Sequence, residues 1–304
     1  MKTLLTGGNG MVGRNILEHN NAPNIQIISP TSQELNLLDR DAVKHFLLKE
    51  MPDLIIHCAG RVGGIQANMA NPVGFLVDNV DMGINVILSA RSVGIPNVIN
   101  LASSCMYPRD AINPLRESMI LKGELEPTNE GYALAKIIST RACEYITQED
   151  CGKNYKTIIP CNLYGRHDKF DPKHSHLIPA VISKLEDAKR QGKKSVDIWG
   201  DGMARREFMY AGDLADLIFF AIARFKEMPQ NLNVGLGRDY SINEYYEAIA
   251  SVVGFNGRFV HDLSKPIGMK QKLVDITQLS NFGWQHKTSL IDGIGHSHKF
   301  YKGI

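Results

Sequence analysis

Tyr132 and Lys136 are the two residues whose types and spacing most directly indicate chemistry. They lie in a segment, 127–138, in which a proline followed by threonine and asparagine predicts the start of a helix. On a helix, a spacing of four places both side chains on one face, one turn apart. A lysine ammonium there favours the phenolate, so we expect a tyrosine pKa below its free value of about 10. Such a tyrosine transfers a proton near neutral pH, as the reduction of a ketone requires. An ordinary surface pair has the same spacing, so this interpretation depends on the elements that position the pair.

A glycine-rich turn follows the first predicted strand, which covers residues 2–5. Gly7, Gly10 and Gly13 are spaced three residues apart and precede an amphipathic helix that ends near Glu18. Glycine here permits a tight turn, lets backbone N–H groups approach a pyrophosphate, and allows the helix to pack closely on the strand. A purely structural turn has the same composition, but a place at the start of a β-α-β pattern favours a dinucleotide site.

The second predicted strand, 25–28, ends in Ser-Pro-Thr-Ser and not in an acidic residue. A carboxylate there would accept hydrogen bonds from the adenosine ribose and repel a 2′-phosphate. Its absence permits NADP, and the hydroxyls of Ser29, Thr31 and Ser32 are candidate partners of that phosphate. No arginine or lysine stands at this strand end, so the preference for NADP over NAD should be modest. Asp39 either hydrogen-bonds the adenine or caps the following helix.

Further strands are predicted over 53–58, 97–102 and 156–160, with helices between them. Strands that alternate with helices form a parallel, doubly wound (Rossmann) sheet of the α/β class, whose ligands lie at the carboxyl ends of the strands. Ser103 and Cys105 follow one of these strand ends, as the loop at Ala59 and Gly60 follows another.

From about residue 166 the sequence becomes polar and loop-like, and a helix is predicted over 177–191. We expect a dinucleotide-binding domain over 1–165 and a smaller C-terminal substrate lobe over 166–304. Short strands near 206–215 and 231–236 should return to the first domain, so the two domains are not cleanly sequential.

Charge and composition argue against several classes of protein. The 34 lysines and arginines nearly balance the 32 aspartates and glutamates, so neither nucleic-acid nor membrane-surface binding is indicated. The N-terminus enters the first strand without a basic and apolar leader, and we expect no apolar run of the roughly 18 residues that a membrane helix needs. The five scattered cysteines indicate neither a disulfide framework nor a zinc site. We expect a cytoplasmic protein.

The stretch 166–176 contains His167, His174 and His176 together with Asp168 and Asp171. Histidine and carboxylate side chains bind metals, yet no His-x-x-x-His pattern places two of them on one helical face. We therefore expect no metal site.

With these segments placed, nearly the whole chain resembles the extended short-chain dehydrogenase/reductase family. The likeness is strongest to its members that act on GDP-linked 4-keto-6-deoxy sugars. It rests on Val62-Gly63-Gly64-Ile65, Ser103-Ser104-Cys105-Met106-Tyr107-Pro108, Leu125-Glu126-Pro127-Thr128-Asn129-Glu130, Asn162-Leu163-Tyr164-Gly165, Ser175-His176-Leu177-Ile178-Pro179-Ala180 and Arg206-Glu207-Phe208.

The resemblance implies an NADP(H)-dependent oxidoreductase that epimerises carbons 3 and 5 of GDP-4-keto-6-deoxy-D-mannose and then reduces its 4-keto group. The product would be GDP-L-fucose, a precursor of surface polysaccharide. The family's usual state is a homodimer, which would pair the helices at 72–94 and 129–149.

By the same resemblance Ser103, Tyr132 and Lys136 form the reductase triad, and Cys105 and His176 are the acid/base pair for epimerisation. The chemistry agrees with these roles. Inversion beside a ketone requires removal of an α-proton, stabilisation of the enolate, and return of a proton on the opposite face. A thiol and an imidazole can carry out both transfers near neutral pH.

The resemblance also implies the binding residues. Cofactor contacts are expected from Gly7, Gly10, Met11, Val12, Gly13, Leu38, Asp39, Ala59, Gly60, Tyr132, Lys136, Asn162 and His176. Contacts to the sugar nucleotide are expected from Lys184, Trp199, Arg206 and Lys272, with Arg206 and Lys272 facing the diphosphate.

The chain departs from the family pattern at three positions. Lys184 stands where relatives usually carry an arginine, and a lysine cannot form the bidentate fork. Asn9 and Pro30 stand where relatives often have arginines for the 2′-phosphate. These departures leave open both the cofactor choice and the identity of the sugar.

Three alternatives remain at this stage. The first is a reductase of another GDP-4-keto-6-deoxy sugar, from a colitose or 6-deoxyheptose pathway, without epimerase activity of its own. The second is a dinucleotide-sensing protein of the same fold, which we would expect to lose the Tyr132 and Lys136 pair. The third is an epimerase or dehydratase that retains its NAD.

Overall fold

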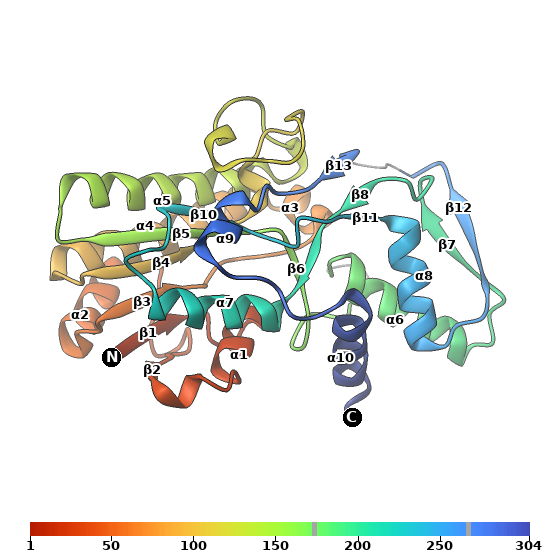
Figure 1. Ribbon diagram of the computed structural model, residues 1–304, viewed down its shortest axis with the longest axis horizontal. Helices are drawn as coiled ribbons and strands as arrows, with labels where there is room; N and C mark the ends of the chain where they lie inside the picture. The colour runs from red at the N-terminus through yellow and green to blue at the C-terminus, as the bar shows by residue number, and fades with distance from the viewer. Residues whose placement is uncertain (172–174, 266–268) are drawn as a thin grey trace.

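The computed structural model describes residues 1–171, 175–265 and 269–304. Its largest element is a parallel six-stranded sheet with the strand order β10-β5-β4-β3-β1-β2 (Figure 1). The chain turns outward from β1 to β2 and then returns to the other side of β1, so the direction of winding reverses between β1 and β3. The expected doubly wound α/β fold is therefore confirmed. The strands are β1 (Lys2–Thr6), β2 (Gln26–Ile28), β3 (Leu54–His57), β4 (Asn97–Leu101), β5 (Asn154–Pro160) and β10 (Asn231–Val234).

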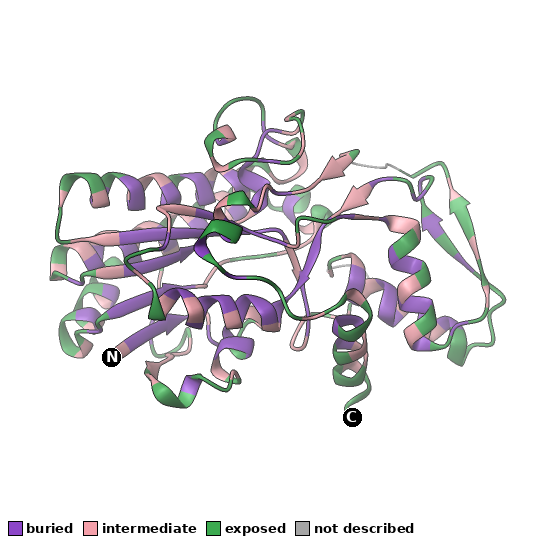
Figure 2. Cartoon of the chain, in the orientation of Figure 1, coloured by how far each residue is buried: buried purple, intermediate pink, exposed green. Residues whose placement is uncertain are grey.

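Helices cover both faces of this sheet. Successive side chains of a strand point to opposite faces, so Leu4 packs under one layer of helices and Leu5 under the other. One layer contains α2 (Arg40–Glu50), α4 (Pro72–Val93) and α5 (Glu130–Glu149), and the other contains α1 (Met11–Leu17), α7 (Ala211–Ala223) and α9 (Thr277–Phe282). Figure 2 shows the buried strands between helices whose outer faces are exposed. Short helical elements are α3 (Ile65–Ala70), η1 (Ala22–Asn24), η2 (Ser104–Met106), η3 (Glu117–Met119) and η4 (Pro127–Asn129).

Helix α4 is long and apolar enough to cross a membrane by length and composition alone, which the sequence analysis did not anticipate. Core helices of doubly wound domains have the same properties, and α4 packs against both α2 and α5. We therefore assign its apolar composition to this packing.

A second hydrophobic core lies beyond the sheet. It is built from α6 (Leu177–Arg190), α8 (Ile242–Val253), α10 (Leu290–Lys302) and the parallel pair β7 (Ser195–Trp199) and β12 (Arg258–Asp262). Two small sheets lie between this core and the main one. They are β6 (Asn162–Tyr164) with β9 (Phe208–Tyr210), and β11 (Tyr240–Ser241) with β8 (Arg205–Arg206) and β13 (Gln271–Lys272).

Two later segments were expected to return to the first domain. Segment 231–234 forms the edge strand β10 of the main sheet, whereas β9 pairs with β6 in a separate sheet. Helix α7 and the buried residues Val274, Phe282 and Trp284 also join the core of the main sheet. The start of α7 falls within the segment 206–215 that was expected to return, whereas the rest of α7 and the residues beyond 270 were not predicted. We propose that all of them belong structurally to the dinucleotide-binding domain.

Candidate active site

A cavity of about 580 Å³ opens at the carboxyl ends of β1, β3 and β4. It lies where the winding of the sheet reverses, which is where doubly wound folds bind their ligands. Its walls come from the glycine turn after β1, the loops after β2 and β3, helix α5, the β5–β6 connection and β13.

The glycine turn is shaped by contacts that leave no room for a Cβ atom at two of its positions. Gly7 has φ +76, and a Cβ added to it would lie 2.7 Å from the nitrogen of Ala59. A Cβ on Gly13 would lie 2.3 Å from the Gly7 carbonyl oxygen. A Cβ on Gly10, in contrast, would meet only that oxygen, at 3.4 Å, because Gly10 borders the cavity. Gly7 and Gly13 therefore let the turn pack, and Gly10 leaves space for a ligand next to the free N–H groups of Met11 and Val12.

The far end of the cavity is lined by Pro30, Thr31, Ser32 and Leu38. Ser29 packs against the glycine turn, since a Cβ on Gly8 would lie 1.8 Å from the Ser29 hydroxyl oxygen. These residues offer hydroxyls and no cation.

Asp39 is not among the residues that line the cavity. Its carboxylate accepts hydrogen bonds at 3.0 Å from the N–H groups of Asp41 and Ala42, at the start of α2. Of the two roles left open for Asp39, the structure shows the helix cap.

Tyr132 and Lys136 face the cavity from the first two turns of α5, as expected. The Lys136 ammonium lies 5.7 Å from the centre of the Tyr132 ring and donates a 2.9 Å hydrogen bond to the Leu101 carbonyl. Burial raises the pKa of the Tyr132 phenol and lowers the pKa of Lys136. The expected lowering of the tyrosine pKa is thus wrong for this geometry, because desolvation penalises the phenolate and the ammonium is directed at a carbonyl.

Cys105 lies in η2, directly after β4, and is buried at the cavity wall. Its N–H donates to the Ser103 hydroxyl at 3.4 Å. Burial raises the pKa of the Cys105 thiol, whereas the Lys272 ammonium opposes this rise. The thiol is therefore protonated at rest, with a cation placed to stabilise its thiolate.

His176 occupies the N-cap position of α6 and borders the same cavity. Desolvation by the cavity wall, followed by the charges of Lys272 and Lys169, lowers its pKa. The residue as a whole is exposed to solvent, and the lowered pKa of its imidazole keeps the side chain neutral at pH 7. Residues 103–105, 132–136, 176 and 272 thus converge from four separate segments.

The structure places one of the four residues predicted to bind the sugar nucleotide at the cavity. Lys272 lines the cavity, but Lys184, Trp199 and Arg206 are not among its lining residues. The Lys184 ammonium donates to the Asp197 carbonyl at 2.6 Å and lies 3.0 Å from its carboxylate. Trp199 is 52% exposed, with the ammonium of Lys265 5.6 Å from its ring centre.

Of the remaining predicted cofactor residues, Leu38, Ala59, Gly60 and Asn162 line the cavity. Asn129 also lines it and was not predicted. Its side-chain oxygen is buried without a protein hydrogen-bond partner in the described part of the chain, so it is available to a ligand. Its position just before α5 is the only sequence signal that could have identified it.

Across the described ranges, histidine, cysteine, aspartate and glutamate side chains form no group of three or more suited to a metal ion. His167 pairs with Glu18 at 2.7 Å, and His174 lies outside the described residues.

The fold and the glycine-lined cavity define a Rossmann-type nucleotide-binding protein, and the chain belongs to the NAD dependent epimerase/dehydratase family, whose model matches residues 3–235. The predicted resemblance to extended short-chain dehydrogenases/reductases is confirmed.

Three relatives define the likeness more narrowly. The chain is 56% identical over 301 residues to the GDP-L-colitose synthase of Yersinia pseudotuberculosis, with 99% of this chain and 98% of that protein covered. It is 48% identical over 300 residues to the GDP-L-fucose synthase of Azorhizobium caulinodans, with coverages of 99% and 96%. Among solved structures, it is similar to the GDP-mannoheptose C4 reductase of Campylobacter jejuni with NADP bound, at a TM-score of 0.89 and 29% identity, with coverages of 99% and 98%.

Proposed function

We propose that this protein is an NADPH-dependent enzyme that epimerises a GDP-linked 4-keto-6-deoxy sugar and then reduces its keto group. The observation that carries this proposal is the convergence of a Tyr/Lys pair with a thiol and an imidazole at one cavity, beside a glycine turn built for a dinucleotide. The full-length relatives named above act on GDP-linked sugars by their names, which supports the substrate class.

The residues present fit NADP(H). Gly10 leaves space beside the first N–H groups of α1, which would receive the pyrophosphate, and Thr31 and Ser32 would meet the 2′-phosphate. When bound, the cofactor supplies a hydride. Lys136 would hold the nicotinamide ribose, and Leu38, Ala59, Gly60 and Asn162 would contact the rest of the cofactor.

In the reduction, the Tyr132 phenol donates its proton to the oxygen of carbon 4, and Ser103 holds that oxygen. The raised pKa of Tyr132 suits this direction of transfer, because the phenol stays protonated until a strongly basic alkoxide forms. Lys136 stabilises the phenolate that remains until solvent restores the proton.

In the epimerisation, the Cys105 thiolate removes the proton from the carbon beside the carbonyl. Ser103 and Tyr132 stabilise the enolate oxygen, and a protonated His176 returns a proton on the opposite face of the sugar. No electrons are gained or lost. Lys272 favours the thiolate and belongs to the site for the substrate diphosphate, together with Arg206, while Lys184 and Trp199 would lie along the rest of the nucleotide.

The leading substrate is GDP-4-keto-6-deoxy-D-mannose, which would give GDP-L-fucose. A second candidate is the 3-deoxy analogue, which leads to GDP-L-colitose, because the relative at 56% identity carries that name. A reductase without epimerase activity remains the third, since the Campylobacter jejuni relative is named for reduction alone.

The deciding experiment separates proton exchange from hydride transfer. Wild-type protein, Cys105→Ser and His176→Asn are each incubated with either 4-keto sugar in deuterated water without NADPH, and products are read by NMR and mass spectrometry. We expect wild-type protein to incorporate deuterium beside the carbonyl, Cys105→Ser to incorporate none, and His176→Asn to exchange without completing inversion.

The same variants are then given NADPH. Cys105→Ser should still reduce a ketone that has already been epimerised, because Tyr132 is untouched. If wild-type protein takes up no deuterium yet oxidises NADPH with the unepimerised ketone, the enzyme is a plain 4-keto reductase.

We further propose a cytoplasmic homodimer in a pathway that supplies surface polysaccharide. All five cysteines are free, as a reducing compartment would keep them. The outer surface of α4 and α5 exposes Val73, Val77, Ile138 and Tyr145, which supports pairing of these helices between two subunits.

A further inference from the structure

The sheet formed by β11, β8 and β13 brings two cations together. Its central strand β8 pairs with β13 in parallel, with Arg205 beside Gln271 and Arg206 beside Lys272. Because side chains alternate along a strand, Arg206 and Lys272 lie on one face of this sheet, and Arg205 and Gln271 lie on the other.

The face with Arg206 and Lys272 carries two like charges on adjacent strands. Burial lowers the pKa of both side chains, and the charge of Arg206 lowers the pKa of Lys272 further, while Glu126 acts in the opposite direction on both. Two cations on adjacent strands repel each other. Strands of only two residues have few backbone hydrogen bonds with which to resist that repulsion.

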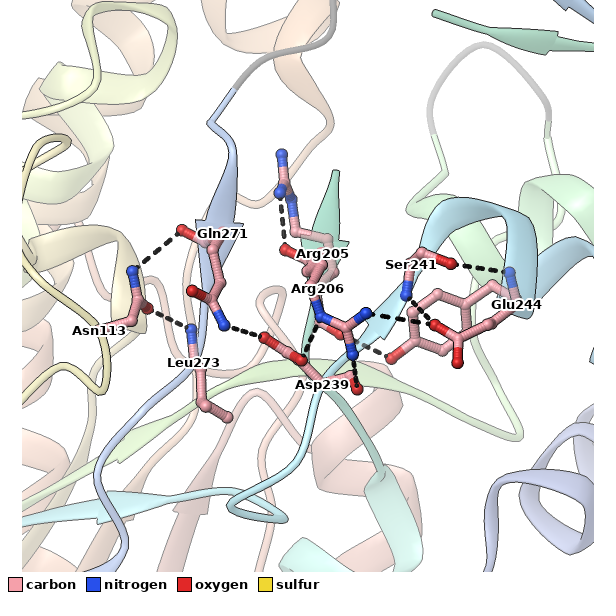
Figure 3. A network of polar contacts seen from close by, with 9 residues as sticks. Asn113, Arg205, Arg206, Asp239, Ser241, Glu244, Gln271 and Leu273 are labelled. Carbon is pink, nitrogen blue, oxygen red and sulfur yellow. Dashed lines mark hydrogen bonds and ion pairs between the residues drawn. The ribbon is translucent and has the colours of Figure 1, made fainter. Parts of the chain in front are cut away.

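The opposite face carries a carboxylate that spans both strands (Figure 3). One oxygen of Asp239 accepts a 2.7 Å hydrogen bond from Arg205 Nε, and the other accepts a 2.6 Å bond from Gln271 Nε2. The Asp239 carbonyl also accepts from Arg205 at 2.8 Å. With Asp239 only 8% exposed, water competes little for these bonds.

Contacts beyond the sheet fix the segment that follows Lys272. Asn113 accepts from the N–H of Leu273 at 2.7 Å and donates to the Gln271 carbonyl at 3.4 Å (Figure 3). The buried Glu207 accepts from the N–H of Val274 at 2.9 Å. These bonds hold β13 along its length, and among the described residues Asp239 is the one that connects a side chain of β13 to a side chain of β8.

We propose that Asp239 is a positioning residue for the diphosphate of the nucleotide substrate. It acts through Arg205 and Gln271 to hold β13 against β8, and so keeps Lys272 and Arg206 on one face at a fixed separation that suits a dianionic group. This inference rests on the proposed function, in which that group is the diphosphate of a GDP-linked sugar.

The test uses GDP as the probe and measures its affinity by calorimetry, alongside the affinity for NADP+ and the melting temperature. Asp239→Asn keeps the shape of the side chain but replaces one acceptor oxygen with an N–H₂ group. That group cannot accept a hydrogen bond, so either Arg205 or Gln271 loses its acceptor. We expect GDP binding to weaken by about tenfold or more, since an unpaired buried donor displaces β13, with NADP+ binding within about twofold of wild type. Gln271→Met, which leaves the Asp239–Arg205 bonds in place, should show the same selective loss.

A rescue variant and a control separate positioning from general stability. In Asp239→Asn with Gln271→Glu, the new amide donates to the new carboxylate, so most of the GDP affinity should return. Asp216→Asn is the matched control, because Asp216 on α7 also joins two partners, Trp284 and Lys287, and neither of them belongs to β8 or β13. It should leave GDP binding unchanged.

Three results would overturn the inference. GDP binding within twofold of wild type in both single variants would show that Asp239 does not position the cations. Equal losses of GDP and NADP+ affinity, with a lower melting temperature and no rescue, would show a merely structural role. Wild-type protein that binds NADP+ but not GDP would remove the proposed function, and the inference with it.

Discussion

The two halves of the active site are built in different ways. The half predicted to hold the dinucleotide consists of glycine turns, backbone N–H groups and small hydroxyls, and its lining between residues 6 and 38 contains no charged side chain. The half proposed to hold the sugar nucleotide depends on Lys272 and Arg206. Their strand neighbours Gln271 and Arg205 are both hydrogen-bonded to Asp239. A site made of backbone is specified by one local motif, whereas a site made of charges needs a supporting network.

This difference predicts how substitutions in each half affect binding and stability. Substitutions in the glycine turn should act through shape, by disturbing packing at Gly7 and Gly13 and by obstructing the ligand at Gly10. Substitutions in the cation pair should act through charge and leave the rest of the protein folded. Tyr132 is proposed to act on the reacting atoms themselves. Its substitution should therefore lower activity strongly without a change in packing or in charge.

Tyr132→Phe should have the largest effect. Removal of the phenol takes away the proton donor for the keto oxygen, so kcat should fall by about 100-fold or more. Affinities for NADP+ and GDP, measured by calorimetry, should be retained. Tyr301→Phe on α10, which does not line the cavity, is the control and should be silent. Near-normal NADPH oxidation by Tyr132→Phe would show that another group supplies the proton.

Gly13→Ala and Gly10→Ala should separate packing from ligand approach. The first places a Cβ 2.3 Å from the Gly7 oxygen, so the turn must shift and the melting temperature should fall, at a cost of roughly 1–3 kcal/mol. NADP+ affinity should fall with it, by more than about tenfold. Gly10→Ala should weaken NADP+ binding while the melting temperature stays near that of wild type. If both variants lost stability equally, Gly10 would be a packing residue too.

Lys272→Gln should test the half that is predicted to hold the sugar nucleotide. The loss of one ammonium beside the diphosphate should weaken GDP binding by about tenfold, while the affinity for NADP+ and the melting temperature change little. Lys184→Gln is the comparison, because the Lys184 ammonium is already engaged by Asp197. A larger loss from Lys184→Gln than from Lys272→Gln would place the diphosphate elsewhere.

The pH dependence of the proposed epimerisation should distinguish removal of the proton from its return. The raised pKa of Cys105 means that the thiolate fraction still increases above pH 7, so deuterium uptake should rise about tenfold from pH 7 to pH 8. The lowered pKa of His176 means that its protonated fraction decreases over the same range, so the ratio of inversion to exchange should fall. Uptake that is independent of pH from 6 to 9 would exclude a thiolate base.

Ser29→Asp should have the smallest effect. A carboxylate there would repel the 2′-phosphate, so the ratio of kcat/KM for NADPH to that for NADH should fall by a few-fold. Wild-type protein should use NADPH at least as well as NADH. A preference of about a hundredfold for NADH in the wild type would contradict the assignment of this strand end.

The dinucleotide half could be predicted closely from the sequence because its signals are local. The helix expected at 72–94 is observed as α4, Pro72–Val93, since a proline begins it and Gly94 ends it in the left-handed region at φ +95. The turn from Gly7 to Gly13 likewise has the predicted close contacts. Periodicity, caps and glycine spacing suffice where a few neighbouring residues determine the structure.

The other half could not be predicted to the same extent. Strands β8 and β13 have two residues each, which is too short for an alternating pattern to be recognised, and they pair across 66 positions of sequence. The Asp239 bridge depends on that pairing. The pKa of Tyr132 depends on burial, which the four-residue spacing to Lys136 does not report.

Strand β10 comes late in the sequence, more than 70 residues after its neighbour β5, and this has a consequence for synthesis of the chain. When the first 165 residues have left the ribosome, β5 is an open edge, and the face that α7 will cover exposes apolar side chains such as Ile99 and Ile158. Open edges and bare apolar faces are the surfaces through which nascent chains aggregate. The glycine turn and its parallel strands can form early, but the sheet is closed only after residue 234 and its core is completed only near Trp284. Ribosome-stalled chains that end before β10 should therefore depend on chaperones far more than chains that end after α9.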